Sequence, residues 1–187
     1  QFCDLIKRTP ETVNVLKKIP FLPVELFKNH EIVTGVYSPE ATFTSSTTTG
    51  GTPSKHHVKE LAHYEKVYVE GFQREFGALE NWTVLALLPS YLERSGSSLV
   101  AMAEGMIKRS TKKESGFYLY NHEELAQVLH NLQKQQQPTL LMGVTFGLLD
   151  FAESISAMDF PQLRVMETGG MKGRRKELVR ARVHALL

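Results

Sequence analysis

The stretch that decides the fold is residues 83–88, which read TVLALL. It is short and almost wholly apolar, as expected of a strand that is covered on both faces in a parallel sheet. Residues 139–144 (TLLMGV) have the same character, and we expect a second buried strand there. We take these two buried strands as the centre around which the other expected elements are arranged.

Helical patterns alternate with short β-prone segments around this centre. Asn121 is followed three residues later by Glu124, which predicts a capped helix start. Further strands are expected at residues 41–45, 117–120 and 163–166, and helices at 10–18, 58–76, 96–108, 146–158 and after Gly170. Such alternation predicts an α/β fold with a mostly parallel sheet and flanking helices. Ligands of such folds bind in loops at the carboxyl ends of the strands.

Composition limits the possible partners. The 187 residues fit about one domain, and 42% of them are hydrophobic. The net charge of +2 is too small for a dedicated nucleic-acid or membrane-surface binder. No apolar run approaches the roughly 20 residues of a membrane span, so we expect none. The lone Cys3 excludes an intrachain disulfide and a multi-cysteine zinc site, and it favours a cytoplasmic setting.

Residues 43–57 (FTSSTTTGGTPSKHH) contain the parts of a polyphosphate clamp. Hydroxyl side chains fill positions 44–49, Gly50 and Gly51 follow, and Lys55 adds a positive charge. With a strand before the segment and a helix after it, the helix start would add a partial positive charge. The contiguous Gly-Lys-Ser/Thr of a P-loop is absent. A flexible Ser/Thr linker is the alternative that composition alone allows.

Two strand-to-helix loops and one basic cluster are further candidates. Tyr91 follows the first buried strand, and Gly143, Thr145 and Phe146 follow the second. Ordinary core packing is the alternative reading for Tyr91 and Phe146. Residues 172–176 carry four cations, expected near the start of the last helix, and a solvated basic patch is the alternative there.

Five segments together resemble the acyl-protein synthetase (LuxE-type) family of adenylate-forming ligases. They run in the family's order along nearly the whole chain: PFLPVELFK (20–28), SSTTTGGTPSKHHV (45–58), LLPSYLERSGSSLVAM (87–102), GVTFGLLDFAE (143–153) and METGGMKGRRKELVR (166–180). The resemblance implies that residues 1–187 are a partial nucleotide- and acyl-binding region within the large N-terminal domain of such a ligase.

The implied activity is ATP-dependent activation of a long-chain fatty acid as an acyl-adenylate, followed by acyl transfer to a protein thiol. ATP and Mg²⁺ are the implied cofactors. A fatty acid and an acyl-accepting or acyl-donating protein are the implied partners. The implied catalytic residues are Lys55 and His56. The implied nucleotide-binding residues are Thr44, Ser45, Ser46, Thr47, Thr48, Thr49, Gly50, Gly169, Gly170, Met171 and Lys172, and the implied acyl-pocket residues are Tyr91, Gly143, Thr145 and Phe146. No metal-ligand spacing of histidines is seen, and the Mg²⁺ ligands are expected outside this segment.

Two alternatives remain open. Thr47 stands where the family has Gly, which motivates a binding module that does not catalyse. A phenylacetate–coenzyme A ligase type, which hands the acyl group to coenzyme A, shares the hydroxyl-rich loop. The chain begins at Gln1 and stops within a helical pattern, so we expect an excerpt of a longer protein. The family's Tyr-Gly-x-Thr-Glu element, smaller C-terminal domain and acyl-accepting cysteine are expected beyond Leu187, and we expect this segment alone to be inactive.

Overall fold

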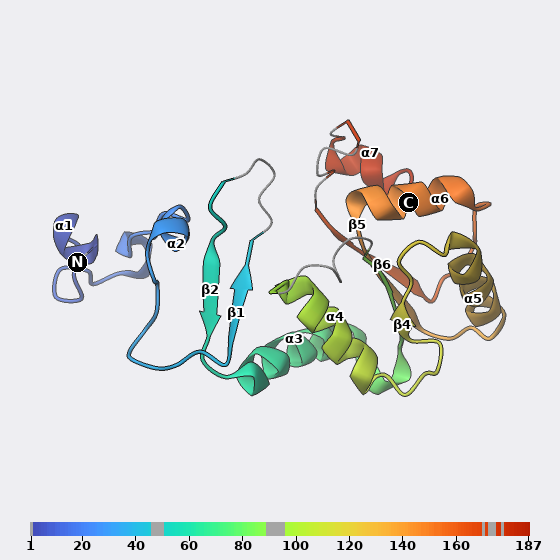
Figure 1. Ribbon diagram of the computed structural model, residues 1–187, viewed down its shortest axis with the longest axis horizontal. Coiled ribbons are helices and arrows are strands. Elements are labelled where there is room, and N and C mark those ends of the chain that lie inside the picture. The colour runs from blue at the N-terminus through green and yellow to red at the C-terminus, as the bar shows by residue number, and fades with distance from the viewer. Residues whose placement is uncertain (1, 46–50, 89–95, 170, 172–174, 177) are drawn as a thin grey trace.

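A computed structural model describes residues 2–45, 51–88, 96–169, 171, 175–176 and 178–187 (Figure 1). Its main body is a parallel sheet with helices around it. A separate two-stranded hairpin and an N-terminal arm extend from one side of that body (Figure 1).

The parallel sheet has four strands in the order β4 (Gly116–Phe117), β3 (Thr83–Leu87), β5 (Thr139–Val144), β6 (Leu163–Thr168). Each neighbouring pair runs parallel, and Thr83 of β3 lies opposite Thr139 of β5. Every residue of β3 and β5 is buried. The predicted α/β fold with a mostly parallel sheet and flanking helices is confirmed, and both central strands lie where their apolar runs placed them.

Helices cover both faces of this sheet because successive strand residues point to opposite sides. Val84 and Ala86 of β3 pack with α3 (Leu61–Phe76) and α4 (Ser98–Arg109). Leu85 and Leu87 pack with α5 (His122–Lys134). Helix α6 (Thr145–Ser154) begins directly after β5 and contributes to both apolar clusters.

Side-chain caps define two of these helices at their first turn. The side chain of Asn121 accepts from the Glu124 amide at 3.1 Å, and its amide group donates to the Glu124 carboxylate at 2.8 Å. Ser97 accepts from the Val100 amide at 3.3 Å at the start of α4. The predicted start at Asn121 is confirmed.

Two helices predicted in the N-terminal part are wrong in place or extent. Residues 10–18 contain only a turn and the 3-10 helix η1 (Leu16–Lys18), with Leu16 fully in solvent. Short helices without a packed face are marginal in water, which explains the difference. The helix predicted from residue 58 begins at Leu61, since the residues before it form β2 (Lys55–Val58).

The bounds of three further elements differ from the predicted ones. Helix α6 ends at Ser154, before the predicted residue 158, and β6 extends two residues beyond the predicted 166. The last helix, α7 (Arg180–His184), begins well after the predicted glycines. The other elements are α1 (Phe2–Leu5), α2 (Leu26–Asn29), β1 (Ala41–Thr44) and η2 (Leu79–Asn81).

Candidate functional site

The hydroxyl-rich loop joins two antiparallel strands and does not run from a strand into a helix. Strand β1 pairs with β2, and Thr44 lies opposite Lys55. Next to this pair, the Ser45 amide donates to the Ser54 carbonyl at 3.0 Å, and the Ser54 amide donates to the Ser45 hydroxyl at 2.9 Å. The described ends of the loop are therefore bridged, while residues 46–50 lie outside the described residues.

This geometry corrects the expected electrostatics of the loop. Lys55 and His56 lie exposed on β2, and α3 begins only at Leu61. The Leu61 amide, one of the first donors of α3, donates to the Glu40 carboxylate at 2.7 Å. A carboxylate of the chain itself therefore lies at the positive helix start where the sequence analysis expects a phosphate, and it accepts from one of the first amides.

The end of β1 next to the loop is fixed to the main body near the start of α4. The Thr44 amide donates to the Gly96 carbonyl at 2.8 Å, and the Phe43 and Tyr64 rings lie 5.1 Å apart. Gly96 has φ +84°, and a Cβ there would lie 3.3 Å from both the Thr42 carbonyl oxygen and the Thr44 hydroxyl. A residue with a side chain would be strained at this position, so Gly96 permits the close approach.

A second candidate region is a cavity at the carboxyl edge of the parallel sheet. Its volume is about 180 Å³. It is lined by Thr145, Glu167, Gly169, Met171, Leu178, Arg180 and Val183. Three residues chosen from the sequence, Thr145, Gly169 and Met171, thus meet in one place. The carboxyl edge is where parallel α/β folds bind ligands.

Thr145 and Glu167 are two of the polar residues that line this cavity. The buried Thr145 hydroxyl donates to the Glu167 carboxylate. Thr145 and Glu167 lie close together because β5 and β6 end side by side, with Val144 opposite Thr168. Sequence reasoning missed Glu167. The available signal was a carboxylate at the end of a predicted strand, two residues before Gly169.

Gly143 and Phe146, predicted to line an acyl pocket, lie in the packed interior. Phe146 is buried within the apolar cluster that covers one sheet face. A Cβ at Gly143 would lie 2.7 Å from Cγ of Leu148 and 3.1 Å from the Leu87 carbonyl oxygen. The absence of a side chain at Gly143 therefore serves the packing of α6 onto the sheet.

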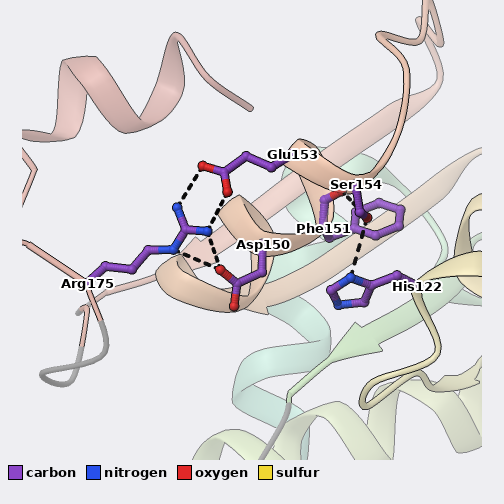
Figure 2. A network of polar contacts seen from close by, with 6 residues as sticks. All are labelled: His122, Asp150, Phe151, Glu153, Ser154 and Arg175. Atoms are coloured by element: carbon purple, nitrogen blue, oxygen red, sulfur yellow. Dashed lines mark hydrogen bonds and ion pairs between the residues drawn. The ribbon is translucent and has the colours of Figure 1, made fainter.

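Arg175 binds two carboxylates of α6 (Figure 2). Its Nε donates to Asp150 at 2.8 Å, and its two Nη atoms donate to the two oxygens of Glu153 at 2.8 and 2.6 Å. One Nη also contacts Asp150. These hydrogen bonds raise the pKa of Arg175 and lower the pKa of Glu153. The cation is thus paired within the chain, and it precedes α7 instead of lying at a helix start.

Histidines gather beside the hairpin. A surface cavity of about 400 Å³ is lined by His56, His57 and His63 together with Tyr64 and neighbouring residues. His57 Nδ1 lies 3.0 Å from the Thr42 hydroxyl. In the part of the chain that the structure describes, no group of three or more His, Cys, Asp or Glu side chains is placed to hold a metal ion.

Several predicted residues lie outside the described residues: Ser46, Thr47, Thr48, Thr49, Gly50, Tyr91, Gly170 and Lys172. Of the others, Thr44, Ser45, Lys55 and His56 belong to the hairpin, and none of them lines the sheet-edge cavity. The described part of the predicted site therefore consists of three groups: the hairpin residues, the cavity residues, and Gly143 and Phe146 in the packed interior.

Comparisons of the chain with protein-family models, curated proteins and solved structures find no match. Among the described residues, no helix is long and apolar enough to cross a bilayer. The fold and the cavity define an α/β protein with a polar pocket at the carboxyl edge of a parallel sheet.

Proposed function

We propose that this protein activates a long-chain fatty acid with ATP to give an acyl-adenylate, and that the acyl group then passes to a protein thiol. The observation that carries the proposal is the meeting of Thr145, Gly169 and Met171, which follow two neighbouring strands, in one cavity at the carboxyl edge of a parallel sheet. The five segments that resemble acyl-protein synthetases support it, since two of them supply these residues.

In this reaction a carboxylate oxygen of the fatty acid attacks the α-phosphorus of ATP. The bond from that phosphorus to the bridging oxygen breaks, and pyrophosphate leaves with the electron pair. A thiolate then attacks the acyl carbonyl carbon, a thioester forms, and AMP leaves. Because both reactants of the first step are anionic, the site has to neutralise charge. Lys55 and the hydroxyls that precede it are the groups proposed for that task.

Magnesium is implied by ATP chemistry, but the described residues do not form a site for it. Among the described residues, Glu167 is the only carboxylate that lines the sheet-edge cavity, and it already accepts the Thr145 hydroxyl. A nucleotide-bound Mg²⁺ takes most of its ligands from phosphate and water, with one or two carboxylates. We therefore derive no step through the metal from this chain.

The proposal is tested with the full-length protein by fatty-acid-dependent exchange of pyrophosphate into ATP and by trapping of the acyl-adenylate with hydroxylamine. Lys55→Met should lower the exchange rate by about a hundredfold, because a cation facing developing negative charge is lost. Lys59→Met is the matched control, since Lys59 is also exposed and lies 3.6 Å from the carboxylate of neighbouring Glu60. Its exchange rate should stay at the wild-type value.

The same assays separate the alternatives. ATP binding without a trapped adenylate would contradict the ligase and support the binding module that Thr47 motivates. Labelled acid recovered on coenzyme A, and not on a protein thiol, would support the coenzyme A ligase type. Lack of both ATP binding and exchange would contradict all three.

A further inference from the structure

Arg175 forms a clamp with two carboxylates of α6, outside the groups that carry the proposed chemistry. Asp150 and Glu153 are three residues apart on α6, so their like charges lie on neighbouring positions of one helix face. The Arg175 guanidinium joins them, with a two-bond fork to Glu153 (Figure 2). Forked pairs of this kind fix orientation as well as charge. The Arg175 side chain is only 28% exposed.

Arg175 of the clamp lies within the β6–α7 connection, which contributes residues to the sheet-edge cavity. Gly169 and Met171 precede Arg175, and Leu178 and Arg180 follow it, yet all four line the same cavity. Helix α6 begins with Thr145, which also lines this cavity. The helix that supplies Thr145 is therefore the helix to which Arg175 is bound.

A second anchor lies close by in sequence. Met171 is 1% exposed and packs in the apolar cluster that includes Phe146 and Val183. Apolar packing of Met171 is not directional, whereas the Arg175 fork is. The two contacts together restrict both the distance and the orientation between the β6–α7 connection and α6.

We propose that Arg175 is a positioning residue for the sheet-edge cavity: through Asp150 and Glu153 it holds the walls formed by Met171, Leu178 and Arg180 against Thr145. This inference rests on the proposed function, because the ligand of the cavity is then part of ATP. Arg175 acts through its carboxylate partners and not by contact with the nucleotide.

The test is equilibrium binding of ATP to the full-length protein, measured by calorimetry. Arg175→Met should weaken ATP binding about tenfold, and the pair Asp150→Asn with Glu153→Gln should weaken it equally. Adding Arg175→Met to that pair should cause no further loss, since the clamp is already broken. Arg175→Lys, which keeps the charge but loses the fork, should fall between wild type and Arg175→Met.

Arg109→Met is the matched control. Arg109 donates to the Glu65 carboxylate at 2.8 Å and joins α4 to α3, far in the sequence from the cavity lining. Its loss should lower stability slightly, as for other exposed pairs, without changing ATP affinity. A change in affinity that merely followed stability would appear in this variant as well, and would overturn the inference.

The remaining outcomes separate this inference from the proposed function. Wild type that binds ATP, with Arg175→Met binding as tightly, would overturn the inference alone. A loss from Arg175→Met that persists in the Asp150→Asn, Glu153→Gln background would show direct contact with ATP and would also overturn it. If wild type binds no ATP, the proposed function fails. Faster amide hydrogen exchange at residues 178–187 in Arg175→Met would then still support the positioning role, and unchanged exchange would overturn it.

Discussion

Residues 2–58 and residues 61–187 of this chain differ sharply in what they bury. In the first region only Phe43 and Val58 are buried among the described residues, and large apolar side chains such as Phe21 and Leu16 are exposed. In the second region two apolar clusters fill both faces of a four-stranded sheet. The comparison shows that an apolar pattern leads to a stable helix or strand only where another helix or strand packs against its apolar face.

The largest expected effect tests this difference in burial directly. Leu85 lies in central strand β3 and is 0% exposed, whereas Phe21 is 96% exposed. Leu85→Ala should lower the free energy of unfolding by about 2–5 kcal/mol, because it removes buried apolar atoms and leaves a cavity. Phe21→Ala should change it by less than about 0.5 kcal/mol. Urea denaturation followed by circular dichroism measures both, and similar losses for the two variants would contradict the comparison.

The same contrast explains which elements the sequence could predict. Residues 139–144 were predicted as a strand and form one over the same range, because every position is apolar enough to be buried on either face. The start of α5 was predicted from Asn121 and Glu124, whose interaction is local. The sequence places Lys55–His57 at the end of the hydroxyl-rich loop and Val58 at the start of a helix, because the pairing of these residues with β1 is a contact between distant residues that periodicity cannot reveal.

The residues of the candidate site also differ in how far the sequence alone could predict them. Thr145 is predicted from its place after a strand, whereas Gly169 and Met171 are implied by the family resemblance. The parallel register brings the two strand ends together. Glu167 was missed because its role depends on which strand ends lie side by side. Gly143 was chosen by position, but its contact with Leu148 depends on the packing of α6, which one sequence does not show.

A second prediction compares two glycines. Gly143→Ala places a Cβ 2.7 Å from Leu148 and 3.1 Å from the Leu87 carbonyl oxygen, so the free energy of unfolding should fall by about 1–3 kcal/mol. Gly71→Ala, at an exposed position of α3 with no atom within 4 Å of the new Cβ, should instead raise it by about 0.5–1 kcal/mol. Denaturant midpoints give the signs. An equal effect of both substitutions would show that Gly143 lies in a looser environment than described.

A third prediction concerns the junction between the two regions. Gly96→Ala would place a side chain at φ +84° and 3.3 Å from the Thr42 carbonyl oxygen. We expect a loss of about 1–2 kcal/mol, smaller than for Leu85→Ala. Hydrogen exchange should show the effect at the Thr44 amide, which donates to the Gly96 carbonyl, before it reaches β5. Equal acceleration in β5 would mean that the hairpin and the sheet unfold as one unit.

The smallest expected effect is a pH dependence at the same junction. Burial raises the pKa of Tyr64 above its usual value of 10.0, and its hydroxyl donates to the Ser98 carbonyl at 3.1 Å. The folded chain thus holds this proton more tightly than the unfolded chain. The resulting stability is fully present below about pH 10 and is lost as the pH rises through the raised pKa.

Tyr64→Phe removes this titration, so its free energy of unfolding should fall less steeply between about pH 9 and 11 than that of wild type. A fall should remain in the variant, because burial also raises the pKa of Tyr68 and Tyr118. The variant also loses the hydrogen bond to Ser98, which lowers its stability by a similar amount at every pH below that range. The slope with pH, and not the offset, is therefore the measurement that decides. Parallel curves for the two proteins would show that Tyr64 ionises as easily in the folded chain as in the unfolded one, and that the ring contact with Phe43 does not shield its hydroxyl from water.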